Sequence, residues 1–425
     1  GANALALNGG TPVISHNFSP YSSIGIEEIE SVRKVMETGV LSKFSGTWHP
    51  DFYGGPKVRA FEKDCAEFFG VKHAVAVNSW TSGLTAAIGV IGLEPGDEVI
   101  VSPWTMGASA TAIIHWNGIP VFADIEAETF CLDPVSVEAA ITPYTKAIIA
   151  VDIFGQSSDI DCLMEIAKKH KLQIISDTAQ APGAHYKGKH AGTLTHIGGY
   201  SLNYHKHIHT GEGGIVVTHD EDYAERIRLI RNHAEEVVEG MKQKNLINMI
   251  GHNYRMGEIE AAIGIEQLKK LTGLVASRQR AAEQLSVGLK ELPGLLTPVV
   301  RSNCTHVYYV YPLILDIQRL GVSRQQIYEV LSAEGVPGLA LGYRNLHLLP
   351  MYQKRIAYGS KGFPWSIARR NINYGKGICP VAEKLHDEEY MGILMCSYEY
   401  HEDDVDLMIE AFHKVWENLD SLQSQ

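Results

Sequence analysis

The spacing of hydrophobic residues changes repeatedly along the first part of the chain, between a helical period and short continuous runs. Residues 25–39 and 55–70 carry apolar side chains at helical spacing, and each segment ends in a glycine, which predicts two amphipathic helices. Buried strands are predicted at the short apolar runs HAVAVNS, DEVIVSP, PVFADI, KAIIAVDIF, QIISDTAQ, IGGYSLN and GGIVVTHD. Because helix-like segments separate most of these runs, we expect βαβ units and a mostly parallel sheet that helices cover on both faces.

The pattern changes after about residue 265. Residues 258–292 read as one long helix, and behind it come the strand-like run HVYYVYPLIL, the helix-like run SRQQIYEVLSAEG and a terminal helix in DDVDLMIEAFHKVWENL. We therefore expect three parts: an N-terminal arm over 1–24, a large domain over 25–265 and a smaller C-terminal α/β domain over 266–425.

Residues 341–366 are aromatic, basic and poor in helix signals. We expect a long surface excursion near the active site there. A functional loop and a plain structural insertion are equally good interpretations of such a segment.

Composition narrows the class of protein. Hydrophobic residues make up 45% of the 425 residues and charged residues 20%, as in a soluble globular protein. The net charge of -12 argues against a nucleic-acid or anionic-membrane partner, although a local basic pocket remains compatible with it. The apolar runs are too short to span a bilayer, and the first residues do not resemble a signal peptide. The six cysteines form no C-x-x-C pair, so we expect free thiols and a cytoplasmic location.

Ligands of parallel α/β sheets bind beyond the carboxyl ends of the strands, so we expect functional side chains among the residues that follow each strand. A helix opens near Thr81, where its N-terminus could bind phosphate or simply carry an ordinary cap. Asp177 follows a strand, with Gln180 three residues later. This pair could hold a protonated ring nitrogen and a ring hydroxyl, or the aspartate could cap a helix. Asn253 and Arg255 precede the long helix.

Residues 201–214, SLNYHKHIHTGEGG, allow two chemistries. Three histidines alternate there: His205, His207 and His209. On an extended strand they would share one face, as metal ligands do, but Glu212 is the only carboxylate close to them. Lys206 would point the other way, and a lysine with a lowered pKa forms Schiff bases with aldehydes. The residues alone leave both interpretations open.

Several segments together resemble a known family. These are SLNYHKHIHTGEGG, IISDTAQAPGA, GLEPGDEVIVSPWT, GGPKVRAFEKDCAEFFGV and GHNYRMGEIEAAIGIEQLKKL. In order and spacing they are similar to the DegT/DnrJ/EryC1/StrS sugar aminotransferases, over about residues 8–420. The resemblance implies the α/β fold of the aspartate aminotransferases (fold type I), pyridoxal 5′-phosphate as cofactor, and a homodimer with active sites at the subunit interface.

The resemblance also implies roles for individual residues. Lys206 would carry the cofactor covalently and then move protons, Asp177 would pair with the pyridine nitrogen, and Gln180 would face the ring hydroxyl. The phosphate would be held by Trp80, Thr81 and Ser201 of one subunit. Asn253 of the neighbouring subunit would also reach it.

Three positions depart from the family's usual pattern. Trp80 stands where a small residue is common, and Pro182 stands where a histidine is usual. Met106 takes the place of the aromatic residue that stacks on the cofactor ring, so Trp104 or Trp80 would have to cover that face.

The resemblance predicts transfer of an amino group from glutamate or glutamine to a keto sugar or keto cyclitol, in antibiotic or cell-surface sugar biosynthesis. The NGGTPV start and the 341–366 excursion favour the cyclitol branch. Related sugar dehydratases carry a histidine at the lysine position, so Lys206 favours the aminotransferase. A PLP- or PMP-dependent dehydratase, a non-catalytic PLP-binding regulator and a metal-dependent hydrolase remain the alternatives.

Candidate substrate contacts fall into two groups. Those predicted to touch the keto substrate are His205, His207, Tyr343 and Arg344. Those that could bind the phosphates of a nucleotide-linked sugar are Lys43, Arg59, Arg344 and Lys354, although a solvated surface charge is the favoured interpretation of each.

Overall fold

A seven-stranded sheet forms the centre of the computed structural model, which describes residues 3–423. Residues 1–2 of the expected arm and residues 424–425 lie outside this description. The strands, in spatial order, are β1 (His73–Val77), β9 (Gly214–Thr218), β8 (Ile197–Ser201), β5 (Gln173–Asp177), β4 (Thr145–Val151), β2 (Glu98–Val101) and β3 (Ile119–Phe122). Strands β8, β5, β4, β2 and β3 are parallel to one another. Strand β9 runs antiparallel to both of its neighbours, β8 and β1. The expectation of a mostly parallel sheet is confirmed.

Both faces of this sheet are buried. Alternate side chains of a strand point to opposite faces, and each face packs against its own set of helices. Val75 and Val216 belong to the core that contains α3 (Trp80–Val90) and α7 (Glu221–Arg231). Ile215 and Val217 belong instead to the core formed with α2 (Pro56–Phe69) and α9 (Glu258–Leu289). Further helices of the large sheet are α4 (Ala108–His115), α5 (Pro134–Ala140), α6 (Ile160–His170) and α8 (Ala234–Val237).

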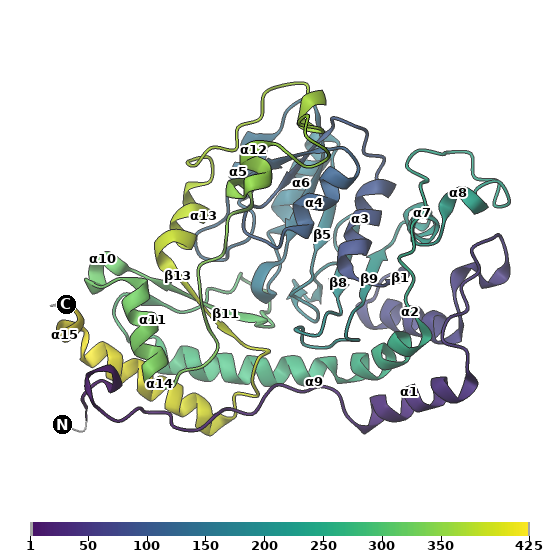
Figure 1. Ribbon diagram of the computed structural model, residues 1–425. Helices are drawn as coiled ribbons and strands as arrows, with labels where there is room; N and C mark the ends of the chain where they lie inside the picture. The colour runs from purple at the N-terminus through teal and green to yellow at the C-terminus, as the bar shows by residue number, and fades with distance from the viewer. Residues whose placement is uncertain (1–2, 424–425) are drawn as a thin grey trace.

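The helix α9 runs along the base of the molecule from the large sheet to the C-terminal sheet (Figure 1). It crosses residue 265, where the sequence suggested a domain boundary. The C-terminal sheet is antiparallel, with the order β10 (Leu295–Leu296), β11 (Val310–Leu315), β13 (Tyr390–Leu394), β12 (Leu339–Leu341). Its helices are α10 (Ile317–Leu320), α11 (Arg324–Ala333), α14 (Glu402–Glu417) and α15 (Leu419–Gln423). Helix α1 (Ile26–Thr38) packs on α9, and the hairpin β6 (His185–Tyr186), β7 (Lys189–His190) lies apart from both sheets.

The excursion that begins at residue 341 is more buried than the sequence suggested. It contains α12 (Pro350–Lys354), is followed by α13 (Pro380–Lys384), and places Tyr352 and Trp365 in the main core. Just beyond it, the Tyr374 hydroxyl donates to the carbonyl of Pro120 in β3, and Arg370 forms two hydrogen bonds with buried Glu98, 2.8 and 2.9 Å long. The segment therefore covers the edge of the sheet at β3, whose carbonyl groups would otherwise lack partners.

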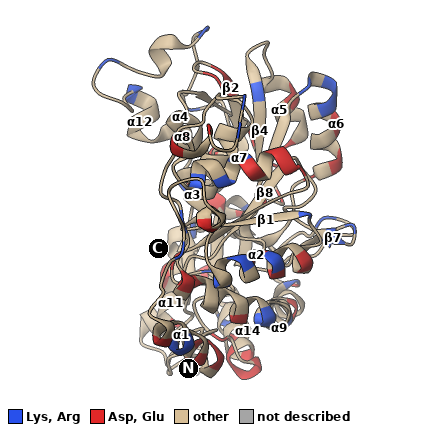
Figure 2. Cartoon of the chain, turned by 90° about the vertical axis from the view of Figure 1, so that its right-hand side faces the viewer, with Lys and Arg blue, Asp and Glu red and all other residues tan. Residues whose placement is uncertain are grey.

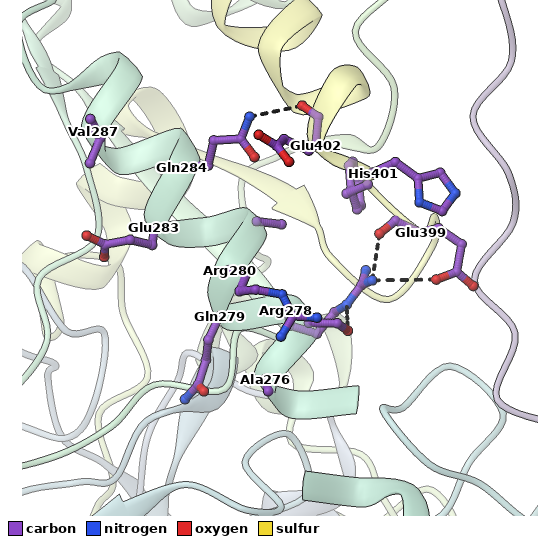
Figure 3. A pocket seen from close by; sticks show the side chains of 13 residues that line it. Ala276, Arg278, Gln279, Arg280, Glu283, Gln284, Val287, Glu399, His401 and Glu402 are labelled. Carbon is purple, nitrogen blue, oxygen red and sulfur yellow. Dashed lines mark hydrogen bonds and ion pairs between the residues drawn. The ribbon is translucent and has the colours of Figure 1, made fainter. Parts of the chain in front are cut away.

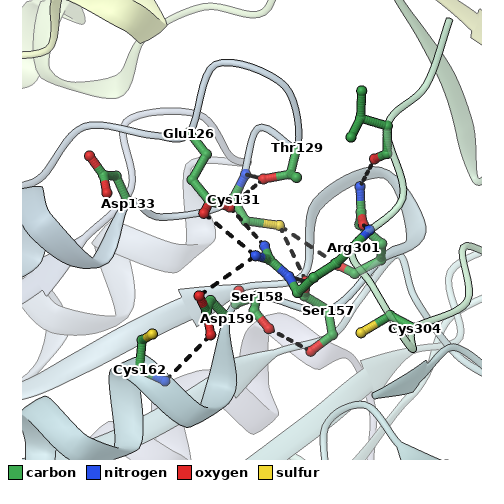
Figure 4. A network of polar contacts seen from close by, with 12 residues as sticks. Glu126, Thr129, Cys131, Asp133, Ser157, Ser158, Asp159, Cys162, Arg301 and Cys304 are labelled. Atoms are coloured by element: carbon green, nitrogen blue, oxygen red, sulfur yellow. Dashed lines mark hydrogen bonds and ion pairs between the residues drawn. The ribbon is translucent and has the colours of Figure 1, made fainter. Parts of the chain in front are cut away.

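Arg301 ties the segment between β10 and β11 of the C-terminal sheet to the loops that follow β3 and β4 of the large sheet (Figure 4). Its guanidinium group lies 2.7 Å from Glu126 and 3.8 Å from Asp159, and it donates to the carbonyl of Ser157 at 3.2 Å. In the same network the buried Cys131 thiol contacts the Ser157 carbonyl, and burial raises the pKa of this thiol to about 12. All six cysteines are free, as expected.

Acidic and basic residues alternate along the chain, without a segment of one charge sign dominating, in the view of Figure 2. Among residues 3–423, none of the helices combines the length and the apolar character needed to cross a bilayer.

Candidate active site

A cavity of about 360 Å³ lies where β4, β5 and β8 end and α3 begins. Most of the cofactor-binding residues suggested by the sequence line it: Trp80, Thr81, Met106, Asp177, Gln180, Ser201 and Lys206. Its position agrees with the rule that ligands bind at the carboxyl ends of parallel strands. We call it the cofactor cavity.

Asp177 is the last residue of β5 and is only 6% exposed. Its carboxylate accepts a hydrogen bond from the Trp80 indole at 2.8 Å on one oxygen and from the Ser109 hydroxyl at 2.6 Å on the other. The Thr105 hydroxyl in turn lies 2.9 Å from that of Ser109. Because both oxygens have fixed partners, the carboxylate faces the cavity in one orientation.

Two glycines make room for the Trp80 indole. A Cβ at Gly199 of β8 would stand 1.9 Å from an indole carbon, and a Cβ at Gly83 would stand 2.9 Å from another. The indole therefore lies against the sheet, and its N–H group reaches Asp177. The large residue at this position thus has a hydrogen-bonding partner as well as a packing site.

Gln180 is oriented by the backbone of a neighbouring loop. The N–H of Phe154 donates to its Oε1 at 2.7 Å, and Phe154 has a φ of 64°, in the left-handed region that non-glycine residues rarely adopt. The amide nitrogen of Gln180 is thereby left as a donor on the other side. The Tyr343 hydroxyl lies near this amide, and burial raises its pKa.

Lys206 follows β8 in a turn and reaches the cavity beside Asp177. Burial lowers the pKa of its ammonium group, while the nearby Asp177 and Cys396 act in the opposite direction. Its Nζ lies 4.4 Å from the centroid of the Tyr309 ring. An amine with a lowered pKa is more often neutral and thus nucleophilic.

The three alternating histidines do not all share one face, because the chain turns after β8 instead of continuing as a strand. His205 lines the cofactor cavity and packs on Tyr204 with ring centroids 3.7 Å apart. His207 is fully buried with its Nε2 2.7 Å from the Val307 carbonyl, and burial lowers its pKa to about 4. Across residues 3–423, the structure holds no group of three His, Cys, Asp or Glu side chains placed to bind a metal ion.

The N-terminus of α3 forms one side of the cavity. The first-turn N–H groups of Trp80 and Thr81 have no acceptor within the helix, and the helix dipole favours negative charge there. Ser201 contributes a hydroxyl to the same cavity. At Gly214 a Cβ would stand 2.6 Å from the Trp80 nitrogen, which explains why the Gly-Glu-Gly-Gly run ends in glycine.

Other residues suggested by the sequence lie apart from this cavity. Asn253 is exposed and accepts a hydrogen bond from the Arg255 N–H. Trp104 is fully buried and stacks on Tyr343, so it does not line the cavity, whereas Met106 stands exposed at its mouth. The four cations suggested for nucleotide phosphates are exposed and outside the cavity lining: Lys43, Arg59, Arg344 and Lys354.

A second cavity of about 320 Å³ adjoins the first. It is lined by Tyr21, Ser23, Tyr204, His205, His209, Tyr309, Leu394, Cys396 and Ser397. Tyr204 and His205 belong to the walls of both cavities. The sequence points only to His205 and His209 as candidate site residues in this lining. Most of the other residues come from the N-terminal arm and from segments next to strands of the C-terminal sheet, and Tyr204 comes from the turn after β8.

A larger, open groove of about 920 Å³ lies between α9 and α14 (Figure 3). Its central cation, Arg278, donates to the carbonyl groups of Met395, Tyr398 and Glu399. This arginine thus holds the turn before α14, and the lining of the groove includes no lysine that could carry the cofactor.

Known proteins resemble this chain over most of its length. It is 37% identical to the spore coat polysaccharide biosynthesis protein SpsC of Bacillus subtilis, over 82% of this chain and 89% of that protein. It is 33% identical to the L-glutamine:2-deoxy-scyllo-inosose aminotransferase of Streptomyces lividus, over 84% and 86%. The crystal structure of DesI with its TDP-sugar product superposes with a TM-score of 0.82 at 27% identity, covering 100% of this chain and 99% of that one.

The pattern of the DegT/DnrJ/EryC1/StrS aminotransferase family matches residues 24–393. These residues include the whole cofactor cavity and the α9 helix. The chain belongs to the DegT/DnrJ/EryC1/StrS aminotransferase family.

Proposed function

We propose that this pyridoxal-phosphate-dependent aminotransferase moves an amino group from glutamate or glutamine to a keto cyclitol or keto sugar. The observation that carries the proposal is the convergence of Lys206, Asp177 and Gln180 on one cavity beside the N-terminus of α3. The relatives include an aminotransferase named for an inosose and a structure that contains a TDP-sugar, which supports both substrate classes.

The residues of the cavity fit the cofactor group by group. When bound, pyridoxal phosphate supplies an electron sink through which an amino group passes between carbon skeletons. The α3 N-terminus and Ser201 suit its phosphate, Asp177 suits its protonated ring nitrogen, and the Gln180 amide suits its ring hydroxyl. The donors from Trp80 and Ser109 keep the Asp177 carboxylate in place for that contact.

Lys206 is the residue that moves protons. Its Nζ, once neutral, accepts the proton from the α-carbon of the amino donor and later delivers a proton to the former carbonyl carbon of the acceptor. The donor ends as a 2-oxo acid and the ketone ends as an amine, so no further reactant is needed. Burial of Lys206 favours the neutral form that this task requires.

A second copy of the chain would complete the site. Large apolar side chains stand exposed around the cavity mouth and on the 246–250 segment near Asn253, with Met106 at 64%, Tyr204 at 59% and Leu246 at 62%. Such exposure is typical of a surface that another chain covers. We infer a homodimer in which Asn253 of one copy approaches the phosphate of the other.

The free cysteines support a reducing, cytoplasmic location.

The test begins with the purified protein and added pyridoxal phosphate. We expect a yellow protein, fixation of the colour at Lys206 by borohydride, and loss of the colour with formation of a 2-oxo acid when glutamine or glutamate is added. A colourless protein that holds stoichiometric zinc would overturn the proposal. A yellow protein that exchanges no amino group with either donor would instead support the regulator.

A further inference from the structure

The second cavity, which we call the neutral cavity, stands between three separate parts of the chain. Tyr21 and Ser23 come from the N-terminal arm, Tyr204 from the turn after β8, and Cys396 and Ser397 from the segment after β13. The Tyr21 hydroxyl donates to the backbone carbonyl of His207, which fixes the arm against the lysine turn. The cavity is thus a built compartment at the side of the reactive amine.

The walls of this cavity offer hydrogen bonds without charge. Its lining residues include no Lys, Arg, Asp or Glu side chain. Burial raises the pKa of Tyr309 and of the Cys396 thiol, each to about 12, and lowers the pKa of His209. Hydroxyl, imidazole and thiol groups that stay uncharged can donate to and accept from the hydroxyls of a polyol.

The neutral cavity opens onto the reacting centre. Tyr204 and His205 line both cavities, and the Tyr309 ring lies 4.4 Å from Lys206 Nζ. A ring of six carbons bound in the neutral cavity would therefore place one ring atom beside this amine. Its volume of about 320 Å³ is at the lower end of small-molecule sites and suits one such ring.

Counter-charges for a diphosphate are scarce in the walls that one copy of the chain contributes to the two cavities. Their walls contain one cation, Lys206, and three carboxylates, Asp152, Asp177 and Glu212. The nearby Arg278 lies 5.0 Å from the Tyr21 ring, but its guanidinium group is engaged by three backbone carbonyls. A diphosphate brought here would lose its hydration without gaining the charge-assisted partners that offset this loss.

We propose that the neutral cavity binds the ring of an uncharged, polyhydroxylated cyclic ketone, so that the acceptor is a free keto cyclitol and not a nucleotide-linked keto sugar. The inference rests on the proposed aminotransferase function and selects between its two substrate classes.

The test separates the two half-reactions. The holoenzyme is first treated with glutamine until its yellow absorbance is lost, which tests the proposed function alone. The donor is then removed. Either scyllo-inosose or a dTDP-linked 4-keto-6-deoxyhexose is added, and the return of the yellow absorbance is followed over a single turnover. We expect saturable return with scyllo-inosose and a kcat/KM at least about tenfold lower with the nucleotide-linked ketone.

The outcomes are distinguishable. Failure of glutamine and glutamate to discharge the colour sinks the proposed function itself. If the donor reacts but the colour returns only with the nucleotide-linked ketone, or with neither ketone, the inference is overturned while the aminotransferase stands.

A filled cavity gives the second arm of the test. Ser397 is exposed and its side chain lines the neutral cavity, so Ser397→Phe fills the space with little strain. We expect kcat/KM for scyllo-inosose to fall at least about tenfold, because the ring no longer fits. Ser332→Phe, at an exposed position of α11, is the matched control and should stay within about twofold. Wild-type turnover by a folded Ser397→Phe enzyme contradicts the inference, and the two-ketone comparison decides it if this variant does not fold.

Discussion

The two adjoining cavities are built in different ways. The cofactor cavity is made of the ends of parallel strands and of helix α3, and it contains all the charged groups of the site. The neutral cavity is made of an N-terminal arm, a turn and the end of β13, and its lining has none. Residues on the central sheet are fixed by hydrogen bonds on both sides, whereas residues on peripheral segments can change without disturbing the sheet.

This difference suggests a division of labour. The chemistry common to aminotransferases requires fixed charges around the cofactor, and the sheet supplies them. The choice of acceptor requires shape and uncharged hydrogen bonds, which the peripheral segments supply. Substitutions in the cofactor cavity should therefore lower kcat, and substitutions in the neutral cavity should raise the KM for the ketone.

Among substitutions in the two cavities, Lys206→Ala should lower kcat the most. We expect kcat to fall by about 10⁴-fold, because the group that moves the proton is gone, while the cofactor still binds non-covalently. Ethylamine added to the variant should restore part of the activity. The exposed Lys168→Ala serves as control, and a Lys206→Ala enzyme that retains measurable glutamine turnover would contradict the assignment.

Asp177→Asn removes the charge but keeps the shape of the side chain. Its oxygen can still accept from Trp80 and its nitrogen can donate to Ser109, so the fold should be unchanged. We expect kcat to fall by about 10²- to 10³-fold, with the KM for the ketone unchanged. The exposed Asp403, outside the cavity lining, gives the matched control Asp403→Asn. Equal losses in the two variants would show that Asp177 has no special role.

Asp152, a fully buried carboxyl group in the wall of the cofactor cavity, gives a test of the comparison through pH. Burial raises its pKa to about 6, so the stability contributed by its protonated form is present below pH 3.8 and is lost as the pH rises through 6. Relative to the wild type, Asp152→Asn should gain about 2 kcal/mol in free energy of unfolding between pH 4 and pH 7. Urea titrations at both pH values measure this gain, and the exposed Asp403→Asn should show none.

Trp80→Phe keeps the packing over Gly199 but removes the N–H donor to Asp177. We expect kcat to fall about tenfold and the pH at which the bound cofactor changes its absorbance to shift, because the carboxylate loses a hydrogen bond. Trp116→Phe is the control, since that indole donates to the Thr85 carbonyl at 2.7 Å, away from the cavity. Identical absorbance titrations for the two variants would reduce Trp80 to a packing residue.

Ser397→Ala should have the smallest effect of these substitutions, and it tests the proposed role of the neutral cavity in ketone binding. Loss of one uncharged hydroxyl should raise the KM for the ketone by about two- to tenfold and leave kcat unchanged. Ser332→Ala, on α11, is its control. A loss in kcat instead of KM would mean that the two cavities do not divide chemistry from selection.

The sheet and the position of the site could be predicted from the sequence. Apolar runs separated by helices determined the strand ends, and the order of the motifs placed Lys206, Asp177 and Gln180 there. These features depend on local patterns, which a single sequence displays. The placement of the three residues in one cavity agrees with that expectation.

Contacts between distant segments could not be predicted. Ser109 and Asp177 are 68 residues apart, and the N–H that orients Gln180 belongs to a residue with an unusual backbone conformation. The histidine alternation misled because periodicity of two indicates a shared face only in a strand, and the chain turns there. Burial of the excursion depends likewise on the edge of β3, which lies more than 200 positions earlier in the sequence.

The slot beneath Trp80 has a consequence for how this protein can evolve. While the indole is present, even a methyl group at Gly199 would overlap it, so alanine is excluded at 199 in this background. A smaller residue at position 80 would not admit this alanine either, because the same Cβ would stand 2.6 Å from the backbone carbonyl oxygen of Ile215 in β9. Evolution can therefore exchange the tryptophan for a smaller residue without opening position 199, where glycine stays fixed as long as β8 and β9 remain paired.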